Sequence, residues 1–190
     1  MTEIQFDEKT LKYLNMLSRI YPTTQSVSTE IINLRAILNL PKGTEHYVSD
    51  IHGEYEGFRH ILRNASGSVR RKIDQALSDY VSTADRDALT ALVYYPELKL
   101  RDLRHKNLLT REWYTITLRQ LVAVCKITTS KYTRSKVRKM LPKDFEYIIS
   151  ELMTTGSKDF NKEEYYGQII DAIIDTDAAD KFIVALCHLV

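Results

Sequence analysis

The sequence predicts a mostly α-helical chain that contains one short β-strand. The 190 residues include only 6 glycines and 4 prolines, so long uninterrupted helices are expected. Apolar residues recur at the 3.6-residue period of an amphipathic helix, most clearly at Phe145, Ile148, Ile149, Leu152 and Met153. Residues 44–49, Thr-Glu-His-Tyr-Val-Ser, instead carry β-prone side chains after a Pro-Lys-Gly turn, and they predict the strand.

Two amphipathic helices are expected before the strand. Their apolar stripes lie at Tyr13–Ile20 and at Ile31–Leu38. Ser28 or Thr29 can N-cap the second helix, because a short hydroxyl side chain can accept a hydrogen bond from the first turn. The Pro-Lys-Gly turn at 41–43 is expected to end that helix.

A tight turn and then a helix are expected directly after the strand. The turn falls at Asp50–Gly53, and the helix runs from about Glu54 to Asn64. Further on, Asp85 can cap a helix at Ala88–Tyr94 that Pro96 stops.

The last third of the chain predicts a central helix followed by three amphipathic ones. Thr110 can cap the stretch Trp113–Ile127, which is apolar on most sides and is expected to be well buried. Pro142 fits the first turn of the next helix, and Gly156 its end. The stripes that start at Tyr166 and Phe182 predict the other two helices.

The predicted strand has no evident partner in the sequence. A lone strand leaves its backbone N–H and C=O groups unpaired, so it needs other strands beside it. The sequence also stops at Val190 within an apolar stripe. We therefore expect this chain to be the N-terminal part of a longer protein whose remaining strands lie downstream.

The composition is that of an ordinary globular protein. Apolar residues make up 44% and charged residues 27%, and the net charge is +2, so no overall field favours nucleic acid or a membrane surface. No apolar run approaches the length of a membrane span. Cys125 and Cys187 match no zinc-binding spacing and are interpreted as core residues of a reduced, cytoplasmic protein.

Asp50 and His52 are the candidate metal ligands. Residues i and i+2 of an extended segment point to the same side, so both side chains can reach one ion. A carboxylate oxygen and an imidazole nitrogen suit a first-row divalent metal such as manganese, iron or zinc. The alternative interpretation is structural: Asp50 caps the following helix, and His52 is a polar turn residue.

The residues around this pair resemble a known superfamily. Residues 47–56, Tyr-Val-Ser-Asp-Ile-His-Gly-Glu-Tyr-Glu, resemble the first motif of the calcineurin-like metallophosphoesterases. Residues 58–67, Phe-Arg-His-Ile-Leu-Arg-Asn-Ala-Ser-Gly, and the Arg-Arg-Lys-Ile run at 70–73 resemble one branch in particular. That branch is the class III fructose-1,6-bisphosphatases of Firmicutes-type bacteria, and the detailed resemblance covers roughly residues 41–73.

The resemblance implies hydrolysis of the 1-phosphate of fructose 1,6-bisphosphate, a gluconeogenic reaction. It implies a dinuclear divalent metal centre, with manganese as the expected ion, and Asp50 and His52 as ligands of the first metal. The strand would belong to an α/β metallophosphoesterase core completed downstream. Residues 1–66 would then hold the N-terminal helices and the first strand, turn and helix of that core, with the metal motif at 49–54. Residues 67–190 would form a helical insertion.

The other motifs of the superfamily are missing. They include Gly-Asp-x-x-Asp-Arg, whose first aspartate bridges the metals, and Gly-Asn-His-Asp/Glu, which supplies a further ligand and a catalytic histidine. The chain has no Gly-Asp and no Asn-His dipeptide. We therefore assign no catalytic residue and expect the isolated chain to be inactive.

Several alternatives stay open from the sequence. The chain can belong to another calcineurin-like phosphoesterase, or it can be a non-catalytic helical module for regulation or assembly. A basic stretch before Pro142 is either a solvated helix face or a docking place for a phosphate-bearing substrate, an anionic small-molecule effector or nucleic acid. It contains Lys131, Arg134, Lys136, Arg138 and Lys139. The helices of 67–190 can also provide a substrate lid or a homo-oligomer interface.

Overall fold

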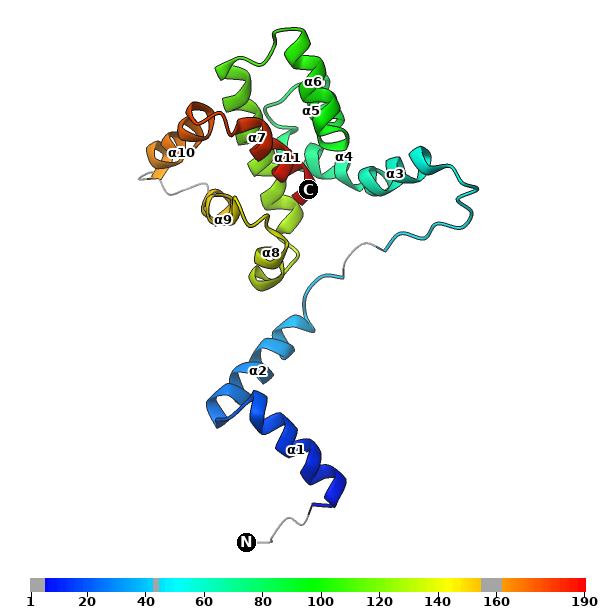
Figure 1. Ribbon diagram of the computed structural model, residues 1–190, viewed down its shortest axis with the longest axis vertical. Coiled ribbons are helices and arrows are strands. Elements are labelled where there is room, and N and C mark those ends of the chain that lie inside the picture. Colours follow the sequence, from blue (N-terminus) through cyan, green and yellow to red (C-terminus); the bar gives the residue numbers. More distant parts are fainter. Residues whose placement is uncertain (1–5, 43–44, 155–161) are drawn as a thin grey trace. The chain divides into compact units, whose positions relative to one another are not determined.

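The computed structural model describes residues 6–42, 45–154 and 162–190 (Figure 1). The chain divides into two units, Met1–Lys42 and Gly43–Val190, which are described separately. The described part of both units is helical and contains no strand. None of the described helices is long and apolar enough to cross a lipid bilayer.

The first unit consists of helices α1 (Glu8–Ile20) and α2 (Thr24–Ile37). The Thr23 hydroxyl accepts a hydrogen bond from the Ser26 N–H at 3.1 Å, and the Ser26 hydroxyl accepts one from the Thr23 N–H at 3.1 Å. This reciprocal cap satisfies the first turn, so the expectation that Ser28 or Thr29 caps α2 is wrong. No residue of either helix is buried, and their predicted apolar stripes are exposed.

The second unit begins with an extended segment rather than a strand. Residues 45–51 have no regular secondary structure, so the expected strand at 44–49 is not formed over its described residues; Thr44 lies outside them. A strand needs a neighbouring strand to pair its backbone N–H and C=O groups, and the described part of the chain contains no second strand.

The helices of the second unit follow this segment. The motif helix α3 is confirmed at Tyr55–Asn64. A short 3-10 turn, η1 (Ala65–Gly67), follows it. The remaining helices are α4 (Ser68–Leu77), α5 (Thr83–Tyr94), α6 (Pro96–His105), α7 (Arg111–Thr129), α8 (Arg134–Met140), α9 (Glu146–Thr154), α10 (Glu163–Asp175) and α11 (Ala179–Leu189).

The helix ends show which local signals decided the fold. Thr110 caps α7 as expected, accepting a hydrogen bond from the Trp113 N–H at 3.1 Å. Helix α5 is capped by Ser82, not Asp85, because the Ser82 hydroxyl accepts the Asp85 N–H at 3.2 Å. Pro96 follows the end of α5, as expected, and is also the first residue of α6.

The ends of α9 differ from the expectation. Pro142 is not in its first turn: the Pro142 carbonyl accepts a hydrogen bond from the Phe145 N–H at 3.0 Å, which closes a separate turn before α9 begins at Glu146. Gly156, the expected end of this helix, lies outside the described residues.

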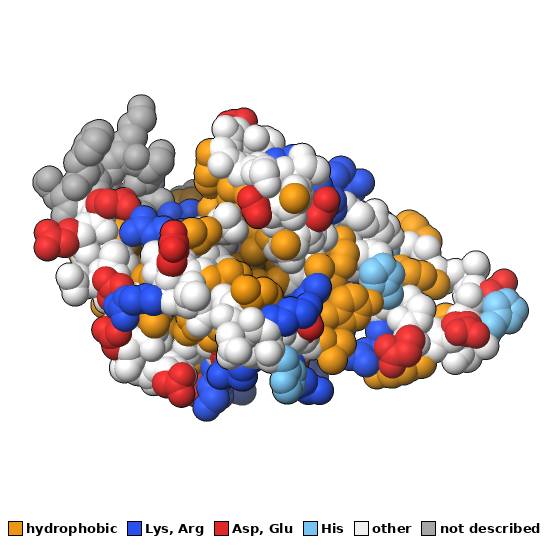
Figure 2. All heavy atoms as spheres, turned by 90° about the horizontal axis from the view of Figure 1, so that it is seen from above, with side chains coloured by type: hydrophobic (Ala, Val, Ile, Leu, Met, Phe, Trp, Pro, Cys, Tyr) orange, Lys and Arg blue, Asp and Glu red, His pale blue; other side chains and the backbone are white. Residues whose placement is uncertain are grey.

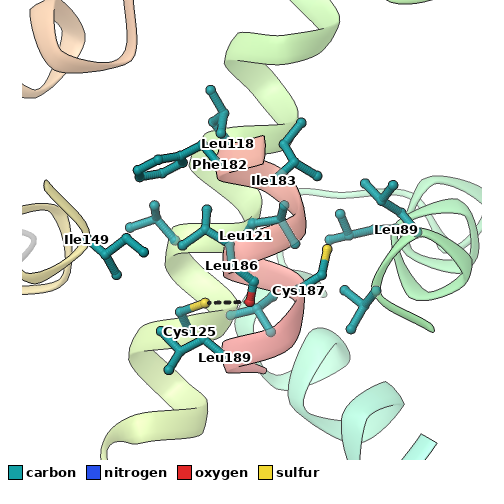
Figure 3. Packing of buried hydrophobic residues seen from close by; sticks show 14 of the residues in the cluster. Leu89, Leu118, Leu121, Cys125, Ile149, Phe182, Ile183, Leu186, Cys187 and Leu189 are labelled. Atoms are coloured by element: carbon teal, nitrogen blue, oxygen red, sulfur yellow. Dashed lines mark hydrogen bonds between the residues drawn. The ribbon is translucent and has the colours of Figure 1, made fainter. Parts of the chain in front are cut away.

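The hydrophobic core forms where α11 packs along α7. In Figure 3, Leu118, Leu121 and Cys125 of α7 face Phe182 and Leu186 of α11. All five side chains are buried, as expected for a central helix at Trp113–Ile127. Helices α4, α9 and α10 also contact α7, and α5 and α6 contact α11, so these two helices organise the unit.

The two cysteines belong to this core, as the sequence indicated. Cys125 and Cys187 are free thiols, and both are buried. The Cys125 thiol donates to the Leu186 carbonyl, with 3.6 Å between sulfur and oxygen. Burial raises the pKa of Cys125 to about 12, so this thiol stays protonated and unreactive at neutral pH.

Polar contacts at the surface join the same helices. The Arg111 guanidinium contacts the carboxylates of Asp171, at 2.7 Å, and Asp175, at 2.5 Å, and so connects α7 to α10. The Tyr114 hydroxyl donates to Asp180 at 2.7 Å. Burial, together with this hydrogen bond, raises the pKa of Tyr114 to about 12. Because the Arg111 pairs are half exposed, they contribute less to stability than the apolar core does.

Acidic and basic side chains are interspersed on the surface, with apolar side chains between them. Figure 2 shows this mixture over the face that it presents. The net charge of +2 agrees with it, since neither sign dominates.

Replacing Phe182 with alanine tests the α7–α11 core. Phe182 is fully buried, and its ring meets that of Phe145 edge-to-face at 5.0 Å. We expect Phe182→Ala to lower the free energy of unfolding by about 3–5 kcal/mol through lost burial and the cavity left behind. Urea unfolding gives the value. Leu98→Ala is the control, because Leu98 is 58% exposed and should cost far less; equal losses would contradict this account of the core.

Candidate metal centre

Asp50 and His52 lie where the extended segment turns into α3. The Glu54 N–H donates to the Ile51 carbonyl at 2.9 Å and closes a tight turn. Its central residues have positive φ, 51° at His52 and 74° at Gly53, as in the type I′ turn. A tight turn was expected at Asp50–Gly53, and it is present one residue further along.

Gly53 serves the backbone of this turn rather than its packing. A Cβ added at Gly53 would have no atom within 4 Å, so a side chain at this position would not clash with a neighbour. Glycine is favoured here by its positive φ, because L-residues with a Cβ are strained in that conformation.

The geometry of the two candidate ligands differs from that of a pleated strand. Asp50 is in the extended segment, but His52 has left-handed backbone, so the argument from strand alternation does not apply to the pair. Both residues are exposed. Among the described residues, no group of three or more His, Cys, Asp or Glu side chains could hold a metal ion. Their role as ligands stays a prediction.

The start of α3 is itself acidic. Glu54 is the N-cap residue, although its side chain makes no capping hydrogen bond, and Glu56 lies in the first turn. Both are exposed, and they place two carboxylates at the positive end of the helix dipole. A cation therefore fits this turn better than a bare anion does, and the carboxylate and imidazole groups present suit a divalent metal.

A hydrogen bond anchors the extended segment to the far end of α3. His46 Nδ1 and the Ser66 hydroxyl lie 3.0 Å apart. Ser66 is held by Asn64, whose side-chain oxygen accepts the Ser66 N–H at 2.8 Å. Ala65, Ser66 and Gly67 all have positive φ, of 46°, 53° and 78°. The Asn-Ala-Ser-Gly run noted in the sequence is thus a left-handed turn that presents Ser66 to His46.

The side chains of α3 provide a second anchor. His60 Nδ1 lies 2.6 Å from the Tyr95 hydroxyl, and the two rings are stacked with their centroids 5.9 Å apart. The Arg63 guanidinium lies over the Tyr95 ring at 5.1 Å from its centroid. His60 is exposed, although its ring has this partner. Both anchors join residues far apart in the sequence, which local patterns do not reveal.

The chain thus combines a helical fold with an exposed Asp-x-His-Gly turn ahead of an anchored helix. It matches the model of the Firmicute fructose-1,6-bisphosphatase family over residues 12–190. The chain therefore belongs to this family, and the resemblance identified in the sequence is confirmed.

Individual relatives agree with the family match. A class 3 fructose-1,6-bisphosphatase of Alkaliphilus metalliredigens is 54% identical over 180 residues, and one of Clostridium botulinum is 52% identical. The alignments cover 95% of this chain and 27% of each relative, so the chain spans about a quarter of the length of the curated relatives it matches. No solved structure matches the chain.

Replacing Ala65 with glycine tests the left-handed turn. Because alanine is strained at a φ of 46°, we expect Ala65→Gly to raise the free energy of unfolding by about 1 kcal/mol. Ala88→Gly, in the interior of α5, is the matched control and should lower it by about the same amount. Urea unfolding measures both variants. A loss of stability in both would show that Ala65 is not strained.

Proposed function

We propose that the protein containing this chain hydrolyses the 1-phosphate of fructose 1,6-bisphosphate. The oxygen of water bonds to phosphorus as the bond between phosphorus and the sugar oxygen breaks. The products are fructose 6-phosphate and inorganic phosphate, as a gluconeogenic enzyme requires. The family match over residues 12–190 carries this proposal, and the names of the relatives agree with it.

Asp50 and His52 would hold one divalent metal of a dinuclear centre, and manganese is the expected ion. When bound, the metals would activate water and stabilise the charge that develops on the transferred phosphoryl group. The exposed turn supports this assignment, because two neighbouring donors are accessible without unfolding any helix. The anchors His46–Ser66 and His60–Tyr95 would fix the position of the turn.

The organisation of the complete protein follows from this assignment. Residues 1–66, with the metal motif at 49–54, would form the start of an α/β metallophosphoesterase core, and 67–190 a helical insertion. The extended segment would then gain strand partners from residues outside this chain. A cytoplasmic location agrees with the two free buried cysteines. Homo-oligomerisation also stays a proposal.

The metal ligands can be tested in the complete protein. We expect Asp50→Ala and His52→Ala each to lower manganese-dependent turnover by at least about a hundredfold, because a metal contributes several kcal/mol to the transition state. Manganese affinity, measured by calorimetry, should fall in parallel. Asp79→Ala and His105→Ala are matched controls at exposed positions outside the motif. Unchanged turnover and affinity in the motif variants would favour the helical regulatory or assembly module instead.

The isolated chain is expected to show no significant bisphosphatase activity. Asp50 and His52 supply two donors, and the described residues add no third His, Cys, Asp or Glu side chain at ligand distance. Phosphate release from fructose 1,6-bisphosphate, measured with and without added manganese, provides the test. Metal-dependent turnover by the purified 190-residue chain that Asp50→Ala abolishes would overturn this expectation.

A further inference from the structure

A pocket lies between the C-terminal end of α7, helix α8 and helix α9, well separated in sequence from the metal motif. Its volume is about 690 Å³, within the size range of small-molecule sites. We call it the α7–α8–α9 pocket, and it is lined by Lys126, Thr129, Ser130, Tyr132, Arg134, Ser135, Val137, Arg138, Leu141, Ser150 and Met153. Among its described lining residues, three side chains are cationic and none is a carboxylate.

Two of the cations are arranged as a pair. Arg134 and Arg138 are one turn apart on α8, so their side chains lie on the same face of the helix. Neither makes an ion pair with any described carboxylate, whereas Arg111 and Arg119 of α7 do. The guanidinium groups of Arg134 and Arg138 therefore keep their fork-shaped donor sets, which match phosphate oxygens.

Lys126 adds a third positive charge from α7. It is partly buried, and burial lowers its pKa while the charge of Glu163 acts in the opposite direction. An anion in the pocket would favour the protonated lysine. Lys126 also lines a neighbouring hollow beside Glu163, so the two arginines are the cations specific to this pocket.

The remaining lining residues favour an organic molecule over a bare ion. Val137, Leu141 and Met153 provide apolar surface. The Tyr132 ring adds an aromatic surface, and the ammonium groups of Lys136 and Lys131 lie 4.5 Å and 5.2 Å from its centroid.

The hydroxyl groups divide into two kinds. Those of Thr129 and Ser130 donate to carbonyls of their own helix, at 2.8 Å in each case, and so present only acceptors to the pocket. The Ser135 and Ser150 hydroxyls donate to no described group and can turn toward an anion.

We propose that the α7–α8–α9 pocket binds a small organic phosphate monoester, with Arg134 and Arg138 holding the phosphate and the apolar lining holding the organic part. A phosphate dianion matches the two guanidinium groups, which have no described carboxylate partner, better than a singly charged carboxylate ligand would. The net charge of +2 provides no strong basic field, whereas nucleic-acid binding needs an extended basic face. This inference does not depend on the proposed bisphosphatase activity, because binding is measured without turnover.

Calorimetry on the 190-residue chain provides the test, with glycerol 3-phosphate as the probe in phosphate-free buffer of low ionic strength. We expect the double variant Arg134→Gln/Arg138→Gln to weaken binding by about tenfold or more. The variant Arg134→Lys/Arg138→Lys keeps the charge but loses the fork geometry. Its affinity for glycerol 3-phosphate should therefore lie between those of the wild-type chain and the glutamine variant. In the wild-type chain, methyl NMR signals of Val137 and Met153 should shift on binding.

The matched control is Lys139→Gln/Lys143→Gln, which removes the same charge from exposed positions outside the pocket lining. It should change affinity by less than about twofold. Thermal unfolding of each variant establishes that it is folded. Inorganic phosphate should bind more weakly than glycerol 3-phosphate.

Four results would overturn the proposal. The first is that the wild-type chain does not bind glycerol 3-phosphate, and the second is that the pocket and control variants weaken its binding equally. The third is that inorganic phosphate binds as tightly as glycerol 3-phosphate. The fourth is that single-stranded RNA displaces the probe and that both double variants weaken RNA binding equally. The last result would assign the region to a general basic surface instead.

Discussion

The packing of α11 against α7 is the interaction on which the second unit depends. Phe182, Ile183 and Leu186 of α11 are fully buried, and so are Leu121 and Cys125 of α7. Helices α4, α9 and α10 pack against α7, and α5 and α6 pack against α11, so the α7–α11 pair positions these five helices. Because interiors are close-packed, a change at this contact would be transmitted to elements that it does not touch directly. The motif region depends on it too, since α3 is joined to Tyr95, between α5 and α6.

The motif region has a different basis for its stability. Its backbone is extended or left-handed, and its side chains are mostly exposed, so little apolar burial holds it. Single polar contacts hold it instead, His46 to Ser66 at one end and His60 to Tyr95 at the other. Such contacts contribute modestly, on the order of 1 kcal/mol each. A segment held this way has little apolar burial to oppose a local change of conformation.

The sequence predicted the features that depend on neighbouring residues. The stripe beginning at Phe145 predicted α9, and Thr110 was recognised as a cap because a hydroxyl before an apolar run suffices for that inference. The turn predicted at Asp50–Gly53 is present one residue later, at 51–54.

Features that depend on competition or on distant residues were missed. Ser82 and Asp85 both suit a helix start, and only the fold shows that the Ser82 hydroxyl reaches the backbone. Helix α4 was covered only by the general expectation that 67–190 is helical, although Val69, Ile73 and Leu77 have the four-residue spacing of an amphipathic helix. In the candidate site, the bonds from His46 and His60 span 20 and 35 residues, beyond any local pattern. The α7–α8–α9 pocket arises from three separate helices, and its basic stretch alone did not distinguish a solvated face from a site.

The position of the sole tryptophan gives the molecule an internal optical reporter. Trp113 lies in the first turn of α7, packs against the core and meets the Tyr114 ring at 5.3 Å. Its emission therefore reports on the environment of α7, whereas the far-ultraviolet dichroism sums over all helices, including α1 and α2, which bury no residue. The two signals sense different parts of the chain. Comparing them therefore separates a change in the surroundings of α7 from a change in the total helix content.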